Sequence, residues 1–158
     1  MFIAKNNDLI VLAKKTREEL EQALDFIIYT DIEETSINYQ MYNGEYLTEE
    51  EIAQQEAERI AKLHLTRGDV FRGLLMAKGV TRSQIRGLIE TLPEETQEQV
   101  LTKEMALIDF DEALEFYRGV SLIDAVGLQL GIIPEQMTRF FETNDYKELL
   151  PKDFEDVE

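Results

Sequence analysis

The stretch RGDVFRGLLMAKGVTRSQIRGLIETLP, residues 67–93, decides the fold class of the second half of this chain. Its apolar residues recur at helical spacing on both sides of Gly79, a residue type that often follows the end of a helix. Thr81 followed three residues later by Gln84 is a capping box, which marks the start of a second helix. That helix ends before Pro93. The stretch therefore predicts two short helices joined by a glycine turn.

Two functions fit such a pair of helices. In a helix-turn-helix that reads DNA, the side chains facing the major groove would be those of Thr81, Arg82, Ser83 and Arg86. In a hairpin that only packs, Thr81 caps the helix and the arginines lie on a solvated face. We favour the packing hairpin because the surrounding chain is strongly acidic, and we keep a DNA-binding regulator as an alternative.

A later segment of the chain resembles the second half of the stretch quoted above. GIIPEQMTRFFET at 131–143 matches GVTRSQIRGLIET at 79–91 in its glycine, a glutamine, several apolar positions and the closing Glu-Thr, at an offset of 52 residues. At the positions that would read bases it carries Ile133, Pro134, Glu135 and Thr138. Two helix–glycine–helix hairpins around one long helix predict a five-helix domain.

The long helix between the two hairpins is predicted for residues 95–118 and is closed by Gly119. Its apolar side chains near one side, which form the expected buried face, are Val100, Met105, Ile108, Ala113, Phe116 and Tyr117. Ser121 and Asp124 are expected to cap a further short helix that ends at Gly131.

The first third of the chain predicts strands and one helix. The apolar runs MFIAK and LIVLA flank an Asn-Asn-Asp turn at 6–8, which predicts a hairpin. A capping box at 16–19 starts a helix over residues 17–29. The alternating segment TSINYQMYNGEYLT contains an Asn-Gly turn at 43–44, the strongest short hairpin signal. The predicted order is β-β-α-β-β over residues 1–47, with the helix covering one face of a small antiparallel sheet.

These segments together predict an α+β protein: a small N-terminal β-β-α-β-β module followed by an all-α domain of about five helices. Thr48 and Glu51 cap a strongly charged helix between the two parts. The predicted division is a small α/β module at 1–47, a connecting helix at 48–65, a helical domain at 66–145 and an acidic tail at 146–158.

The charge of the chain is its strongest compositional feature. Its 158 residues carry 16 basic and 33 acidic side chains, a net charge of −17. Residues 66–92 form a basic island of +3 between segments of −8 and −12. Such a field repels phosphate backbones, so we do not expect nucleic acid as a partner. The absence of cysteine excludes disulfides and thiolate zinc sites.

The apolar runs are short and interrupted. None approaches the roughly 20 residues needed to cross a bilayer. The N-terminal run is broken at 6–8 and has no basic region before it, so we expect neither a signal peptide nor a membrane anchor. From this we expect a soluble protein, intracellular where it is made, without membrane partners.

Catalysis has little support in the residues present. His64 is the only histidine, which makes a triad of nucleophile, histidine and acid improbable. The segment DFDEALE concentrates carboxylates, but their spacing places Asp111 and Glu115 on a solvated helix face, and no calcium-binding loop is present. No glycine-rich phosphate loop exists. We therefore predict no enzyme activity, no catalytic residues, no cofactor and no metal.

The second predicted hairpin carries the candidate partner surface. A small sheet covered by one helix leaves a face and two edges without cover. The apolar and aromatic side chains there, which we predict to contact another protein or a second copy of this chain, are Tyr39, Met41, Tyr42 and Tyr46.

Two long runs resemble proteins of bacteriophages. The run LTRGDVFRGLLMAKGVTRSQIRGLIETLPEETQEQVLTKEMALIDFDEALEFYRGVSLIDAVGLQLGI resembles uncharacterised small proteins encoded in phage and prophage genomes among tail and fibre genes. The N-terminal FIAKNNDLIVLAKKTREELEQALDFIIYTDIEET, with YNGEYLT, is similar to a module found on other phage proteins with different C-terminal halves. The resemblance brings no catalytic motif.

The resemblance implies a virion-associated, structural or assembly protein that acts through protein–protein contacts. Its expected location is the host cytoplasm during production and then the virion, with other phage proteins or a second copy as partners. Two alternatives stay open beside it. One is an acidic mimic of nucleic acid that inhibits a host defence complex, and the other is the helix-turn-helix regulator.

Overall fold

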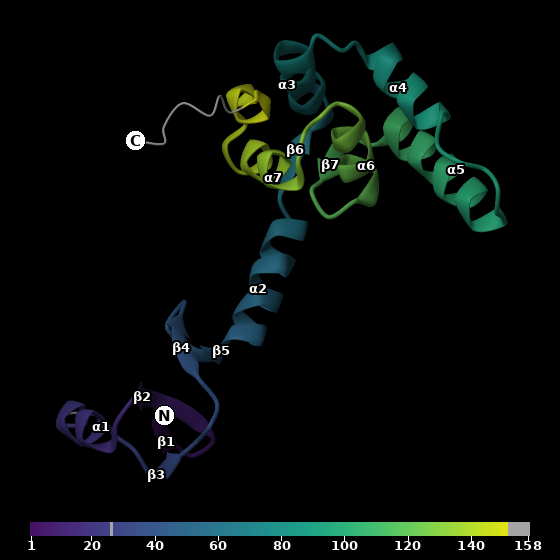
Figure 1. The fold of residues 1–158 in the computed structure, drawn as a ribbon. Helices are drawn as coiled ribbons and strands as arrows, with labels where there is room; N and C mark the ends of the chain where they lie inside the picture. Colours follow the sequence, from purple (N-terminus) through teal and green to yellow (C-terminus); the bar gives the residue numbers. More distant parts are fainter. Residues whose placement is uncertain (26, 152–158) are drawn as a thin grey trace. The chain divides into compact units, whose positions relative to one another are not determined.

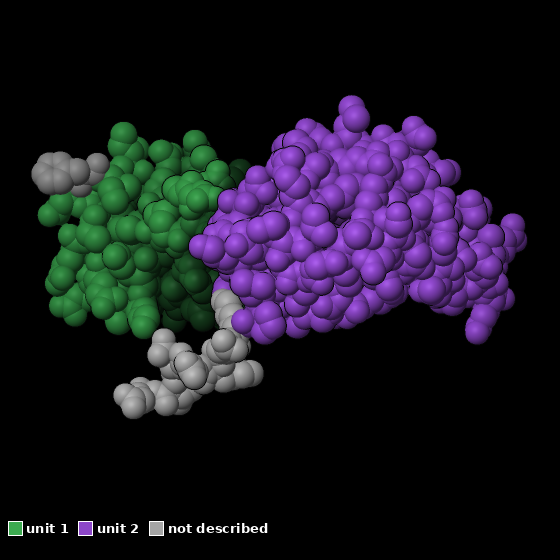
Figure 2. Space-filling model, turned by 90° about the horizontal axis from the view of Figure 1, so that it is seen from above, with its two compact units in different colours: residues 1–58 green, residues 59–158 purple. Residues whose placement is uncertain are grey.

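The computed structural model describes residues 1–25 and 27–151, drawn as a ribbon in Figure 1. The chain divides into two compact units, Met1–Glu58 and Arg59–Glu158, shown in two colours in Figure 2. Strands predominate in the first unit and helices in the second, so the predicted α+β class is confirmed. Most of the predicted acidic tail, from residue 152 onward, lies outside the described residues.

The described residues of the first unit form short strands and one complete helix. In chain order its elements are β1 (Phe2–Asn6), β2 (Leu9–Lys14), α1 (Arg17–Ala23), β3 (Asp31–Glu34), β4 (Tyr39–Tyr42), β5 (Glu45–Thr48) and the start of α2 (Glu49–Ala61). Strands β2, β1 and β3 form one antiparallel sheet with β1 in the centre. Its small core consists of Ala4, Leu12, Leu20 and Leu24.

The local signals of this unit are confirmed. The turn between β1 and β2 places Asn7 at φ 56, in the left-handed region that asparagine tolerates. The Thr16 hydroxyl accepts a hydrogen bond from the backbone N–H of Glu19, and the Glu19 carboxylate accepts one from that of Thr16. In the β4–β5 hairpin, Asn43 and Gly44 have φ 48 and 87, as a type I′ turn requires.

Three features of this unit differ from the prediction. Helix α1 ends at Ala23 rather than at residue 29, and strand β3 was not predicted. The charged sequence of β3 has no apolar alternation, so its extended form depends on pairing with β1, where Glu33 meets Lys5 at 2.7 Å. The Thr30 N–H donates a hydrogen bond to the Lys5 carbonyl of β1 at 2.6 Å. Residue 30 therefore lies beside the sheet and not in a continuation of α1. In addition, β4 and β5 form a sheet of their own rather than part of a single sheet.

In the described part of the second unit, five α-helices follow α2 in the predicted order. Its elements after α2 are β6 (His64–Thr66), α3 (Arg67–Lys78), α4 (Arg82–Glu90), α5 (Gln97–Glu112), β7 (Glu115–Tyr117), α6 (Ser121–Gln129), α7 (Pro134–Thr143) and a 3-10 helix, η1 (Tyr146–Leu149). The two similar segments have the same local geometry. Gly79 and Gly131 have φ 67 and 70, and a helix begins three residues after each.

A two-stranded sheet in this unit was not predicted. The connecting helix α2 ends at Ala61, and residues 64–66 pair with residues 115–117, so the long helix α5 ends at Glu112 instead of reaching 118. Leu65 and Phe116 lie opposite each other in the register and are both buried. Three-residue strands are too short to give a periodic signal, and only their pairing stabilises them.

The predicted side of α5 and the predicted caps of α6 also need correction. Met105 and Ile108 of the expected buried face are exposed, whereas Phe110 is buried. Ser121 is the first residue of α6 rather than its cap, and no side chain caps that helix, because the capping position is occupied by Val120. Asp124 pairs with Arg118. The start of the predicted tail is ordered, since Leu149 of η1 is fully buried.

Candidate interaction surfaces

A groove in the first unit gathers most of the predicted partner residues. Tyr39 and Met41 on β4 and Tyr46 on β5 line it, with Leu9 and Val11 of β2 on the other side. Its volume is about 610 Å³. Met41 and Tyr46 are cross-strand neighbours in the hairpin register, which places both side chains on the same face. Leu9 and Met41 are 74% and 57% exposed, so the groove offers apolar side chains to a partner.

The edge and rim of this groove define what it can bind. Strand β2 is an outer strand of its sheet and pairs only with β1 among the described strands. A sheet edge with unpaired backbone groups accepts an added strand. Three carboxylates lie in the lining, those of Asp8, Glu45 and Glu51. The arrangement therefore suits an extended segment with apolar side chains and a positive or neutral charge.

The fourth predicted partner residue faces elsewhere. The Tyr42 hydroxyl donates a hydrogen bond to the Glu56 carboxylate of α2 at 2.8 Å. Because side chains alternate along β4, Tyr42 points away from the face that carries Tyr39 and Met41. The structure thus brings three of the four predicted residues into one groove and gives the fourth an internal contact.

The candidate DNA-contact residues lie at the start of α4, where they make contacts within the chain. The Thr81 hydroxyl accepts from the backbone N–H of Gln84, so this side chain caps the helix. Arg82 and Arg86 approach the Asp111 carboxylate at 3.8 and 3.3 Å. Arg86 also pairs with Glu90, one helical turn along α4. Ser83 is exposed.

Two of the arginines of this region also lie over aromatic rings. The Arg82 guanidinium lies 5.7 Å from the Phe71 ring centroid and 5.6 Å from that of Phe110. The Arg67 guanidinium lies near the same two rings, and its Nη1 donates to the Asp111 carbonyl at 2.6 Å. Asp111 was predicted only as part of a solvated carboxylate face. In the structure, Asp111 at the end of α5 contacts arginines of both α3 and α4, and its negative charge compensates part of the positive charge of residues 66–92.

Arg118 is a buried charge that the sequence did not single out. Its side chain is 7% exposed and lies just after β7. It donates to the Thr138 hydroxyl at 3.0 Å, to the Pro134 carbonyl at 3.0 Å and to the Asp124 carboxylate at 3.1 Å. These contacts tie β7 to α6 and α7. An arginine six positions from a carboxylate gives no motif, so no sequence signal identifies it.

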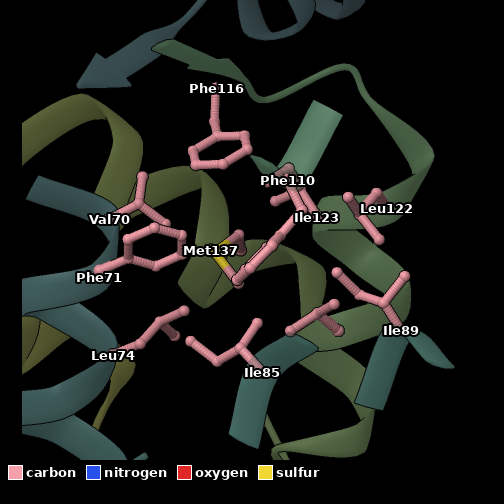
Figure 3. Close-up of a pocket in the computed structure, with 11 residues that line it drawn as sticks. Val70, Phe71, Leu74, Ile85, Ile89, Phe110, Phe116, Leu122, Ile123 and Met137 are labelled. Carbon is pink, nitrogen blue, oxygen red and sulfur yellow. The ribbon is translucent and has the colours of Figure 1, made fainter. Parts of the chain in front are cut away.

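The centre of the second unit contains an apolar pocket, shown in Figure 3. Its lining side chains come from all five helices and β7 and point toward one another: Val70, Phe71, Leu74, Ile85, Ile89, Phe110, Phe116, Leu122, Ile123, Val126 and Met137. The free space is only about 30 Å³, and no polar side chain lines it. A dry space of this size is a packing gap in the core rather than a ligand site.

The single histidine of the chain makes an aromatic ring contact. The His64 ring lies 5.3 Å from the Tyr117 ring, across the β6–β7 pair. Across residues 1–25 and 27–151, no group of three or more histidine, aspartate or glutamate side chains is placed to hold a metal ion.

No helix among the described residues is long and apolar enough to cross a membrane. In comparisons with known proteins, no family model, no curated protein and no solved structure matches this chain.

Proposed function

We propose that this chain is a phage-encoded, non-enzymatic protein that acts in particle structure or assembly through protein–protein contacts. The observation that carries the proposal is the groove between β2 and the β4–β5 hairpin, with its exposed apolar side chains and an unpaired strand edge. The phage setting is part of the proposal and rests on the resemblance inferred from the sequence alone. The proposed partner is an extended segment of another phage protein or of a second copy.

The groove has the properties of a binding site rather than of an ordinary sheet surface. The groove offers apolar side chains of three kinds, the thioether of Met41, the aromatic ring of Tyr46 and the aliphatic chain of Leu9. Beside them lie backbone groups of β2 with which an added strand can pair. Aromatic and methionine side chains are enriched at protein interfaces. The backbone edge supplies hydrogen bonds and the side chains supply selectivity, as in other cases of strand addition.

The test is incorporation into phage particles. The chain and its Met41→Glu variant are supplied during particle production, and purified particles are analysed by mass spectrometry. The wild type is expected in the particles in several copies, and Met41→Glu is expected to be depleted about tenfold or more, as for an interface residue worth 1.4 kcal/mol or more. Ile37→Glu is the matched control, because Ile37 is 47% exposed in the same unit and does not line the groove.

Two results contradict the proposal. Absence of the wild-type chain from particles, together with no binding to any other phage protein, removes the structural role. Equal depletion of both variants shows that the groove is not the contact site.

One observation favours a second candidate, the acidic mimic of nucleic acid. The chain carries −17, and the basic island that could oppose this field is partly neutralised by Asp111 and Glu90. A mimic is absent from particles, is made early in infection, and binds a basic host complex in a manner that salt reverses. Pull-down at about 50 and 500 mM salt, compared with particle analysis, separates the two functions.

A further inference from the structure

Helix α5 is apolar on two sides, and the described residues cover only one of them. Ala106 and Phe110 are buried in the core of the second unit. Leu101, Met105 and Ile108 are 56%, 64% and 59% exposed. Their spacing of four and three residues places these three side chains on one face of the helix. A helix with apolar residues on more than one side is normally covered on each of them.

A groove runs beside this exposed row. Its volume is about 480 Å³, and Met105 belongs both to the row and to the groove wall. The apolar part of its lining consists of Leu92, Ala106, Val120, Leu122 and Ala125, from the end of the α4 segment, α5 and α6. We call the exposed row Leu101, Met105 and Ile108, together with this groove, the α5 face.

The charges around the α5 face have one sign. Four exposed carboxylates flank it on α5, those of Glu98, Glu104, Asp109 and Glu112. None of the four forms an ion pair with a described residue. The single lysine of α5, Lys103, does not offset them, because its side chain is only 12% exposed and its Nζ pairs with Glu94 at 2.8 Å.

We propose that the α5 face binds a cationic amphipathic helix of another protein, with apolar side chains on the row and in the groove and lysines or arginines against the four carboxylates. A helix suits the site better than a strand because no sheet edge borders the groove. A second copy of this chain is a poor occupant, because two acidic faces would repel each other. This proposal concerns the second unit and is independent of the groove proposed for the first.

The test uses a model peptide, because the natural partner is not identified. The probe is a fluorescent peptide of leucine and lysine, about 15 residues long, with the leucines on one helical face. That length covers about 22 Å at 1.5 Å per residue, enough to span the row. Binding to the full chain is measured by fluorescence anisotropy at about 150 mM salt, where exposed charges alone are largely screened.

The expected result is saturable binding that Met105→Glu weakens at least about tenfold, since it puts a charge in the apolar centre. Ile108→Ser, a milder change, is expected to weaken it by about threefold to tenfold. The matched control is Met76→Glu on α3, because Met76 is 62% exposed and lies outside the α5 face. It is expected to bind as the wild type does. Circular dichroism checks that each variant is folded.

Several results would overturn the proposal. The same affinity for a scrambled peptide of equal charge would mean that charge alone attracts the probe. The same affinity for a peptide with glutamates in place of the lysines would remove the role of the four carboxylates. If Met76→Glu weakens peptide binding as much as Met105→Glu does, or if the wild type does not bind the peptide, the α5 face is not the binding site. A dimer seen by sedimentation velocity that Met105→Glu dissociates would make a second copy the occupant.

Discussion

Gly73, in the middle of α3, is a position where one added methyl group would clash with a buried aromatic ring. A Cβ atom there would lie 2.6 Å from Cε2 of Phe140 and closer still to its Cζ. Carbon atoms in good contact are about 3.5–4.0 Å apart, so the ring would have to move by about 1 Å. Phe140 is 1% exposed and packs in the core of the second unit, so its ring can shift only by displacing neighbouring side chains or by moving toward the groove that Gly73 also lines. Gly73→Ala therefore overpacks the contact between α3 and α7.

The expected magnitude follows from two opposing terms. Alanine is favoured over glycine inside a helix by about 1 kcal/mol. Overpacking a core costs about 1–3 kcal/mol, and a clash with a buried ring belongs at the upper end. The free energy of unfolding is thus expected to fall by about 2 kcal/mol in Gly73→Ala. Gly87 in α4 provides the control, because a Cβ there meets nothing within 4 Å. Gly87→Ala is expected to gain up to about 1 kcal/mol.

Urea denaturation followed by circular dichroism at 222 nm measures both variants, since most helical residues belong to the second unit. The two variants are expected to differ in free energy of unfolding by about 3 kcal/mol, with unchanged dependence on urea. If Gly73→Ala is as stable as Gly87→Ala, then Phe140 does not pack on Gly73 and the arrangement of α3 and α7 is wrong. A loss in both variants would mean that the helices themselves do not tolerate the change.

Three further predictions concern charged residues. Arg118→Leu is expected to destabilise the second unit by about 2–3 kcal/mol, since it removes charged hydrogen bonds from a buried site, and a change below about 0.5 kcal/mol in urea denaturation would contradict this. In gel shifts at about 150 mM salt, duplex DNA is expected to remain unbound, and a shift that Arg82→Glu or Arg86→Glu abolishes would restore the helix-turn-helix hypothesis. The pKa of Asp69 is lowered below its ordinary 3.8 by the Thr66 hydroxyl, which donates to its carboxylate, and then by Arg72. A carboxylate whose pKa is lower in the folded state than in the unfolded state stabilises the fold at pH values above its unfolded pKa. This stabilisation is lost as the pH falls through the folded-state pKa. The difference in free energy of unfolding between wild type and Asp69→Asn should therefore shrink below about pH 4 and stay constant above about pH 6. A constant difference from pH 2 to 7 would show that the carboxylate charge adds nothing.

The candidate surfaces were predictable only in part. The alternation around the Asn43-Gly44 turn identifies Tyr39, Met41 and Tyr46 as side chains of one hairpin, two of them on one strand face. It does not reveal that β2 lies across from them, because contacts between β2 and the hairpin join residues some 30 positions apart. Asp111 likewise lies 25 residues from Arg86 in the chain, so the ion pair between them has no local signal.

What the sequence determined by itself is local. Threonine at positions 16, 66, 81 and 96 caps a helix in each case by accepting a backbone hydrogen bond three residues ahead. Asparagine or glycine takes the left-handed conformation at positions 7, 43, 44, 79, 131 and 144. These contacts lie within four residues and need no other part of the chain. They mark the starts of α1, α3, α4 and α5 and the turns of both N-terminal hairpins.

Only the tertiary structure decided the features that join distant segments. Strands β3, β6 and β7 exist because a partner strand satisfies their backbone groups, and Arg118 is buried because Thr138, Pro134 and Asp124 converge on it. Helix α5 shows the limit most clearly. Its apolar residues surround the helix, so periodicity cannot choose a buried side, and packing buries Ala106 and Phe110 while Met105 and Ile108 stay exposed. Burial is decided by which surfaces of the folded chain fit together, and that is a property of distant residues rather than of local spacing.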